Sequence, residues 1–216
     1  VREHEIRAII GPNGAGKSSM LNCINGVYTP SEGSITFRGQ TFDHMDSHQV
    51  ATMGIARTFQ NLALFKGMSV LDNIMTGRNL RMKSNLLLQA LRIGPAEREE
   101  MQHRERVERI IDFLEIQAHR KTPVGQLPYG LQKRVDLGRA LALEPQVLLL
   151  DEPFGALDAL TRGNLQEKLM QICNEHQLTA VMVTHDVDEA VLLSDRIVML
   201  TNGPGSKIGG ILEVDI

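Results

Sequence analysis

Short apolar runs along the chain predict a series of β-strands. Val147–Leu150 is a continuous apolar run of the kind found in parallel strands that are covered on both faces. Ser34–Arg38 alternates apolar and polar residues between two glycines, which predicts a half-exposed antiparallel strand. Further strands are predicted at Ile6–Ile10, Ile55–Phe59, Thr179–Val183 and Arg196–Leu200. We expect the last of these to complete the core sheet.

Between the strands, apolar residues recur with helical spacing. Val107, Ile110, Ile111 and Leu114 lie at positions i, i+3, i+4 and i+7, which predicts an amphipathic helix with a charged outer face. Helices are also predicted over Lys17–Asn25, Gly130–Leu143, Leu157–Cys173 and Asp186–Leu193. We expect a single α/β domain over residues 1–216, with a helical subdomain of about residues 67–138 inserted in its core.

The composition is that of an ordinary globular protein. The 216 residues are 42% hydrophobic and 23% charged, which excludes a disordered or collagen-like chain. A net charge of −3 lacks the basic excess of a general nucleic-acid binder, so no nucleic-acid partner is expected. Cys23 and Cys173 are far apart in the sequence, which favours reduced thiols in a cytosolic protein. No apolar run approaches the roughly 18–20 residues that cross a bilayer, and no signal segment is evident at the N-terminus.

A glycine-rich segment between a predicted strand and a predicted helix matches the pattern G-x-x-x-x-G-K-[ST]. Glycines in such a loop let backbone N–H groups point at phosphate oxygens, and the next helix adds its positive N-terminus. Lys17 then reaches the β and γ phosphates, and Ser18 ligates Mg²⁺. The alternative, an accidental glycine-rich turn, is disfavoured by the flanking strand and helix. The predicted nucleotide-binding residues of this loop are Gly11, Pro12, Asn13, Gly14, Ala15, Gly16, Lys17, Ser18 and Ser19.

Two acids follow the most apolar of the predicted strands. Asp151 and Glu152 come directly after Val147–Leu150, at the end where open α/β sheets bind ligands. Beside a phosphate loop, Asp151 is expected to hold the Mg²⁺ shell and Glu152 to polarise the attacking water. A buried strand that happens to end in surface acids is the alternative, and without the phosphate loop the two interpretations would be about equal.

Six motifs follow one another along the chain, and they are Gly11–Ser18, Thr58-Phe-Gln60-Asn, Leu127-Pro-Tyr-Gly130-Leu-Gln-Lys-Arg, Asp151-Glu-Pro153, Gly155-Ala-Leu-Asp158 and Thr184-His-Asp186. They occur in the order seen in the ATPase subunits of ABC transporters, and the chain resembles that family over essentially its whole length. The resemblance implies a P-loop NTPase core of the RecA-like type, an inserted α-helical subdomain and a partial antiparallel β subdomain. It also implies ATP and Mg²⁺ as cofactors and ATP hydrolysis as the activity.

The resemblance assigns roles to further residues. Gln60 is expected to contact the Mg²⁺ or the attacking water. It is therefore a predicted metal-site residue together with Ser18 and Asp151, and a predicted catalytic residue together with Glu152. His185 is expected to contact the γ-phosphate through its imidazole N–H. Taken alone, Gln60 and His185 would be interpreted as ordinary polar residues at strand ends.

The resemblance also implies partners. Asp158 is expected at the seam of an ATPase dimer, and Gly130 with the helix after it presents N–H groups to the nucleotide held by the second ATPase subunit. Integral membrane permease subunits and, indirectly, a substrate-binding protein complete the assembly. The chain is accordingly expected as a peripheral protein on the cytoplasmic face of the inner (plasma) membrane.

Two features depart from the family pattern. Pro128 stands where the family signature has a serine, and a lost hydrogen bond to a charged group costs roughly 1.5–3 kcal/mol, enough to slow turnover. Only ten residues precede Gly11, so the strands that carry an adenine-stacking aromatic residue in the family are expected to be missing.

The two parts of the chain resemble different branches of the family. Residues 1–153 resemble importers of branched-chain amino acids, through Ile55–Asn61, Met68–Ile74 and the signature variant. Residues 154–216 resemble importers of nitrate, sulfonate and taurine. The chain therefore resembles a composite, which a natural recombinant, an engineered chimera or a joined record would each produce. Because in this family the permease contacts the helical insert and the loop that corresponds to Gln60, the resemblance favours a branched-chain amino acid importer, with a nitrate or sulfonate importer as the alternative. The alternative from another class of function is a module that binds nucleotide but is catalytically impaired.

Overall fold

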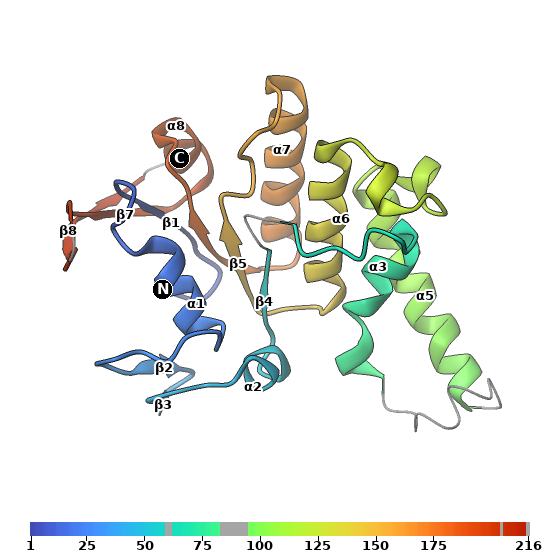
Figure 1. The fold of residues 1–216 in the computed structure, drawn as a ribbon, viewed down its shortest axis with the longest axis horizontal. Helices are drawn as coiled ribbons and strands as arrows, with labels where there is room; N and C mark the ends of the chain where they lie inside the picture. The colour runs from blue at the N-terminus through green and yellow to red at the C-terminus, as the bar shows by residue number, and fades with distance from the viewer. Residues whose placement is uncertain (59–61, 83–94, 204, 215–216) are drawn as a thin grey trace. The chain divides into compact units, whose positions relative to one another are not determined.

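The computed structural model describes all residues except 59–61, 83–94, 204 and 215–216. The chain forms two compact units (Figure 1). The first unit consists of Val1–Gln60 and Gln146–Ile216, and the second unit consists of Asn61–Pro145. Among the described residues, no helix has the length and apolar character that a membrane crossing requires.

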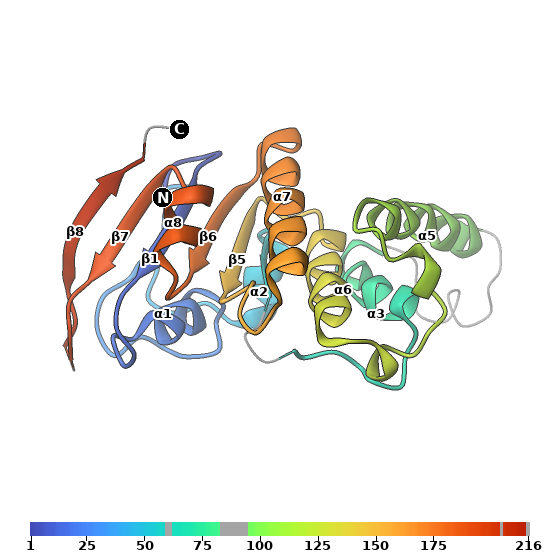
Figure 2. The same cartoon turned by 90° about the horizontal axis from the view of Figure 1, so that it is seen from above.

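A six-stranded sheet forms the centre of the first unit. Five strands are parallel, and β8 runs antiparallel to β7 at the sheet edge. The order across the sheet is β4-β5-β6-β1-β7-β8. Figure 2 shows the part of this order from β5 to β8. The strands are β1 (Ile6–Ile10), β4 (Ile55–Arg57), β5 (Val147–Asp151), β6 (Thr179–Val183), β7 (Arg196–Leu200) and β8 (Ile208–Glu213).

The register of the parallel strands brings three of their carboxyl ends together. Asp151 on β5 lies opposite Val183 on β6, and Val183 lies opposite Ile9 on β1. The loops that follow these strands therefore leave the same edge of the sheet side by side. They contain the phosphate loop, Glu152 and His185, which places three of the predicted motifs at one edge.

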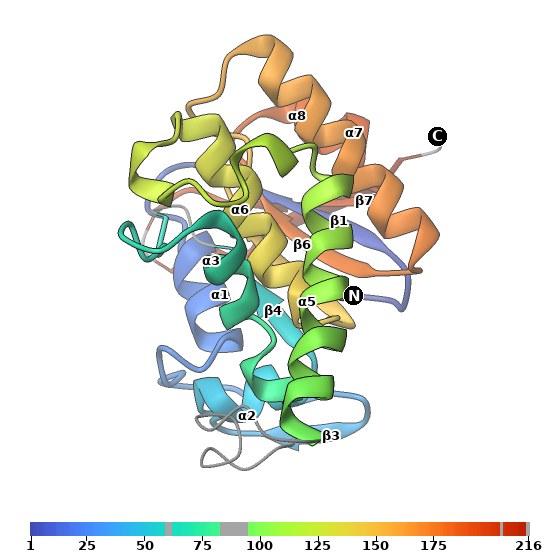
Figure 3. The same ribbon diagram turned by 90° about the vertical axis from the view of Figure 1, so that its right-hand side faces the viewer.

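Helices cover both faces of the sheet. α7 (Ala159–Glu175) and α8 (Val187–Leu193) lie on one face, and α1 (Lys17–Ile24) and α2 (Ser47–Thr52) lie on the other (Figures 1 and 3). The strand residues on the α1 face pack with Leu21 of α1 and Val50 of α2 in one apolar core. This burial on both faces explains why the strand sequences are continuously apolar rather than alternating.

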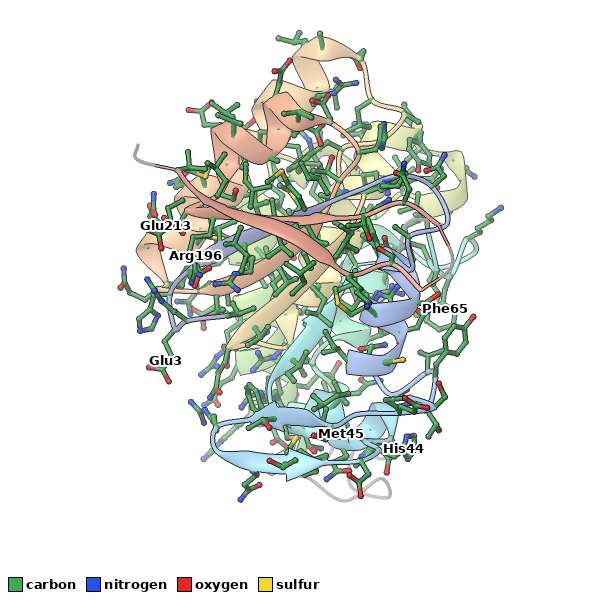
Figure 4. The ribbon with its side chains drawn as sticks, turned by 90° about the vertical axis from the view of Figure 1, so that its left-hand side faces the viewer. Glu3, His44, Met45, Phe65, Arg196 and Glu213 are labelled. Atoms are coloured by element: carbon green, nitrogen blue, oxygen red, sulfur yellow. The ribbon has the colours of Figure 1, made fainter. Side chains whose placement is uncertain are left out.

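A two-stranded hairpin of β2 (Ile35–Phe37) and β3 (Gln40–Phe42) forms a second, smaller sheet. Met45, which lies between this hairpin and α2 in the sequence, is fully buried and packs in the apolar core of the unit (Figure 4). At the opposite edge of the unit, Arg196 on β7 and Glu213 on β8 face each other, with Nε and Oε1 3.6 Å apart (Figure 4).

The predicted strands and helices of the first unit are present, with differences at their ends. Ile55–Arg57 forms a strand, but Phe59 lies outside the described residues. α7 begins at Ala159 rather than Leu157, because the Asp158 carboxylate caps the helix by accepting a hydrogen bond from the Thr161 N–H at 3.0 Å. The expectation that Arg196–Leu200 is the last strand of the core sheet is wrong, because β8 pairs with it over its whole length.

The second unit is helical in its described part. α3, α5 and α6 pack against one another (Figure 3). The helices are α3 (Val70–Thr76), α5 (Pro95–Phe113) and α6 (Tyr129–Ala142), with short 3-10 turns η1 (Asn79–Arg81), η2 (Gln117–His119) and η3 (Val124–Gln126). Val107, Ile111 and Leu114 are fully buried, as their helical spacing predicts.

A buried cation ties three elements of the second unit together. Arg78, which is 2% exposed, precedes η1 and donates from Nε to Nδ1 of His103 on α5 at 3.0 Å. Its Nη1 donates to the Ala142 carbonyl at the end of α6 at 2.7 Å and lies 3.1 Å from Oε1 of Glu144. Because His103 accepts from Arg78, its ring must be neutral at Nδ1.

This contact predicts a loss of stability in mild acid. Burial, and then the charge of Arg78, lower the pKa of His103, while the carboxylate of Glu99 opposes the shift. The unfolded chain binds a proton near pH 6.5 and the folded chain only at a lower pH, so stability falls as the pH drops from about 6.5 towards the folded pKa. Urea unfolding at about pH 7.5 and pH 5.5 measures the difference.

The replacement His103→Asn keeps an acceptor near Arg78 and removes the titration. We expect it to reduce the loss of stability between the two pH values, whereas His48→Asn, on an exposed part of α2, should leave that loss unchanged. An equal loss in His103→Asn and the parent chain would contradict the prediction.

Candidate active site

The phosphate loop leaves β1 and enters α1 with a backbone that only glycine adopts easily. Gly14 and Gly16 have φ values of +84° and +81°, and a Cβ atom added at either would meet no protein atom within 4 Å. Ala15 N–H donates to the Pro12 carbonyl at 3.2 Å, which closes the turn before the helix. The space in front of both glycines is therefore open to a ligand that approaches the backbone closely.

Lys17 lies inside this loop. Its side chain is buried, and Nζ donates to the carbonyls of Gly11 at 2.7 Å and Pro12 at 3.0 Å. The first turn of α1 contains no acidic residue and no capping side chain. A cation and an uncompensated helix N-terminus therefore share one loop, as a phosphate group requires. Of the other predicted residues, Pro12, Asn13 and Ser19 are exposed, and Gly11 and Ser18 are half-buried.

Ser18 and Asp151 meet across the edge of the sheet. Ser18 Oγ donates to Asp151 Oδ1 at 3.1 Å, so two of the three predicted metal-site residues are in contact. Within the described ranges, no three His, Cys, Asp or Glu side chains form a metal site. A hydroxyl and one carboxylate nevertheless fit Mg²⁺, which prefers oxygen ligands and takes its remaining ones from water and phosphates.

The structure adds two residues that the motifs did not identify. Arg57, at the end of β4, donates from Nη2 to Asp151 Oδ2 at 2.8 Å and from Nη1 to Oδ1 of Asn22 on α1 at 2.6 Å. The side chains of Arg57 and Asp151 are each only 4% exposed. A basic residue on an otherwise apolar strand, Ile55-Ala-Arg57, was the available signal for a buried ion pair.

Glu152 follows directly in an unusual conformation. Its φ is +47°, in the left-handed region that is disfavoured for residues other than glycine, and its N–H donates to the Val183 carbonyl at 2.9 Å. Its Oε1 lies 3.7 Å from Nδ1 of His185, whose side chain is 64% exposed. The two predicted catalytic residues at the ends of β5 and β6 are therefore neighbours.

A network behind His185 supports the loop on which it lies. Thr184 is buried and donates from Oγ1 to Oε2 of Glu189 at 2.7 Å, and it accepts from the Asp186 N–H at 3.1 Å. Burial raises the pKa of Glu189. Arg162 on α7 lies 3.9 Å from Glu189 and donates to the Leu157 carbonyl at 3.1 Å. The loops after β5 and β6 thus share one polar support.

Thr184→Val is expected to lower the free energy of unfolding by about 1–3 kcal/mol, because a buried carboxylate loses its hydrogen-bond donor. Urea unfolding measures the change. Thr36→Val is the matched control, because its hydroxyl bonds to Thr41 on an exposed hairpin, and it should cost no more than about 0.5 kcal/mol. Equal effects of the two replacements would show that the Thr184 contact contributes nothing.

The remaining predicted residues are placed as follows. Asp158 is exposed, caps α7 and has a pKa lowered by its hydrogen bonds to Thr161. Gly130 lies in the first turn of α6, in the second unit, where Pro128 precedes the helix without a side-chain cap. Gln60 lies outside the described residues.

Comparisons with known proteins identify the family. The sequence model of the ABC transporter family matches residues 1–155. The bicarbonate transport ATP-binding protein CmpC of Synechococcus elongatus is 50% identical over 218 aligned residues, which cover 100% of this chain and 30% of that protein. The nitrate transport protein NasD of Klebsiella oxytoca is 42% identical over 100% of this chain and 76% of its own length. The chain thus spans less than a third of the length of CmpC.

Solved structures agree with the sequence relatives. A dimeric post-hydrolysis state of an ATP-binding cassette bound to ADP and Pi has a TM-score of 0.80 and 25% identity, over 100% of this chain and 88% of that chain.

The relatives do not support the expected split between two branches. The alignment to CmpC covers the whole chain, on both sides of Pro153, and these relatives are bicarbonate and nitrate proteins rather than branched-chain amino acid importers. The nitrate alternative therefore agrees better with the comparisons than the amino acid interpretation. The chain has the fold of an ATP-binding cassette and belongs to the ABC transporter family.

Proposed function

We propose that the chain is the ATP-binding and ATP-hydrolysing part of an ABC importer. The observation that carries the proposal is the arrangement at one edge of the sheet. There the Lys17 loop follows β1, and the Ser18–Asp151 contact joins this loop to the end of β5, where Glu152 follows. The Lys17 loop would bind the triphosphate, the Ser18–Asp151 pair would bind the metal ion, and Glu152 would be the base for hydrolysis.

The loop residues bind the phosphates. Backbone N–H groups at the N-terminus of α1 would bind phosphate oxygens in the open space in front of Gly14 and Gly16. Lys17 Nζ, which is bound to the loop carbonyls of Gly11 and Pro12, is close enough to change partners and bind phosphate oxygens instead. Ser18 and Asp151 would hold Mg²⁺, with Gln60 as a further proposed ligand, and the bound ion neutralises phosphate charge.

Glu152 and His185 act on the γ-phosphate end in this proposal. The Glu152 carboxylate accepts a proton from the attacking water, and the neighbouring His185 imidazole donates an N–H to a γ-phosphate oxygen. The Thr184–Glu189 support keeps the His185 loop in place while its ring remains exposed to the ligand.

The nucleotide site is completed by a second subunit in the proposal. The N-terminus of α6, with Gly130 in its first turn and no acidic residue there, would face the nucleotide bound by the partner, and Asp158 would lie at the seam. The dimeric cassette with ADP and Pi supports such an assembly. Pro128 removes one hydroxyl from this contact, so we expect a slower turnover than in chains with serine there.

The second unit would contact the permease. A pocket between α3 and α5 is lined by three methionines, Met68, Met75 and Met82, together with Asp72 and Arg104. Methionine side chains adapt to varied surfaces and are frequent where a helix of another protein docks. The complex would hold the chain on the cytoplasmic face of the membrane.

The transported substrate we propose is a small oxyanion of the bicarbonate or nitrate class, on the support of CmpC and NasD.

Phosphate release from ATP tests the catalytic part of the proposal. We expect hydrolysis in Mg²⁺ that stops when EDTA is added, and tight binding of ATP without phosphate release would instead identify an impaired nucleotide-binding module. Proteoliposomes that contain the chain with its co-purifying permease and binding protein test the substrate. Stimulation of hydrolysis by bicarbonate or nitrate supports the proposal, and stimulation by leucine alone would contradict it.

A further inference from the structure

We propose that Arg57 is a positioning residue, which fixes the Asp151 carboxylate in the orientation that binds Mg²⁺. The inference rests on the proposed function, since it concerns the metal that accompanies ATP. It assigns a task to a residue that lies outside the phosphate loop and the acidic motif, at the end of β4.

The two carboxylate oxygens of Asp151 have different hydrogen-bond partners. Asp151 Oδ2 accepts from Arg57 at 2.8 Å, while Oδ1 accepts from Ser18 at 3.1 Å. A carboxylate whose plane is turned away from Arg57 and Ser18 would lose both contacts. Arg57 therefore fixes the plane of the carboxylate, so that one oxygen faces Ser18 on the side of the phosphate loop.

Arg57 is itself held from a second direction. Asn22 Oδ1, on the helix that begins at the phosphate loop, accepts from the other terminal nitrogen of the guanidinium at 2.6 Å. One planar group thus joins β4, β5 and α1 and bonds to two side chains at once. A lysine ammonium is a point charge without such a fork, so it cannot reproduce both contacts in a fixed orientation.

An ordinary buried ion pair is the competing interpretation. Arg57 and Asp151 are both almost fully buried, and such a pair neutralises charge wherever it occurs. Removal of the arginine charge would destabilise the fold under either interpretation. Only changes that keep the charge and disturb the orientation separate positioning from neutralisation.

The structure offers two such changes. Arg57→Lys keeps the positive charge and loses the fork, and Asn22→Ala keeps the Arg57–Asp151 pair and removes its outer support. Arg7→Lys is the matched control, because Arg7 pairs with the buried Glu5 at 2.6 Å in the same unit, on β1. Circular dichroism confirms that each variant is folded before binding is measured.

The measurement is the gain in nucleotide affinity that Mg²⁺ provides. A fluorescent, non-hydrolysable ATP analogue is titrated in EDTA and in Mg²⁺, and the ratio of the two dissociation constants reports metal binding by linkage. We expect Arg57→Lys to reduce this ratio by about tenfold and Asn22→Ala to reduce it by a smaller factor, as loss of an outer-shell partner does at metal sites. The affinity for the analogue in EDTA should match the parent chain in all three variants. Arg7→Lys should also keep the parent ratio of the two dissociation constants.

Each result decides between the interpretations. An unchanged ratio in both Arg57→Lys and Asn22→Ala, in folded protein, would overturn the positioning role and leave only charge neutralisation. If Arg57→Lys does not fold, the result for Asn22→Ala decides alone. A parent chain that binds the analogue without any effect of Mg²⁺ would also overturn the inference, whereas a parent chain that binds no nucleotide would refute the proposed function itself.

Discussion

Glu152→Gln is expected to lower the rate of ATP hydrolysis by about 10²–10⁴-fold and to leave ATP affinity within about threefold of the parent chain. Glutamine has nearly the same size and hydrogen-bonding reach as glutamate, but its amide cannot take the proton of the attacking water. Glu152 lies outside the phosphate loop, and its side chain is 22% exposed, so its replacement disturbs neither Lys17 nor the core.

Phosphate release and analogue binding, measured on the same preparation, check the two halves of this prediction. In the proposed dimer, the variant should also accumulate as a dimer in ATP, because closure is no longer followed by hydrolysis. Glu213→Gln on β8 is the control, since Glu213 is exposed at the far edge of the sheet. Hydrolysis at the parent rate in Glu152→Gln would remove Glu152 from the role of base.

The phosphate loop and the strands around it were predictable because their signals are local. Gly14 and Gly16 occupy positions with positive φ, and their spacing to Lys17 follows from the turn itself. Val147–Leu150 is buried on both faces, which its continuous apolar sequence indicates. The gathering of residues 11–18, Asp151 and His185 also follows from the rule that parallel strands end at one edge.

Edge and hairpin elements were missed because their sequences carry weak signals. β8 reads Ile208-Gly-Gly-Ile-Leu-Glu213, and two glycines in a strand remove the alternation that predicts one. β3 was missed because Arg38 and Gly39, at φ values of +49° and +75°, form a tight hairpin turn in which arginine replaces the usual asparagine or aspartate.

Contacts between distant residues were beyond the sequence. Arg57 and Asp151 are 94 positions apart, and although a basic residue on an apolar strand indicates a buried ion pair, the sequence does not identify its partner. The left-handed backbone of Glu152 is equally hidden, because local strain of about 1–3 kcal/mol persists only where the surrounding fold imposes it. Resemblance to a family located Asp151 and Glu152 in a motif, but only the structure shows which atoms hold them.

Lys17→Met is expected to weaken the binding of ATP by about 10–100-fold, because a hydrogen bond to a charged group contributes about 1.5–3 kcal/mol and 1.4 kcal/mol is tenfold in affinity. The fold should survive the change. The carbonyls of Gly11 and Pro12 lose their donor, but they lie on a loop that is half-buried to exposed, where water can replace it.

The position of Lys17 predicts which nucleotides bind more weakly to Lys17→Met. An ammonium group that binds the β and γ phosphates contributes to the affinity for ATP and ADP but not to that for AMP, so titrations with AMP should give the same constant in both proteins. Lys207→Met, at an exposed residue directly before β8, controls for the loss of one positive charge at long range. A uniform loss across ATP, ADP and AMP would show that Lys17 supports the shape of the loop instead of binding the phosphates.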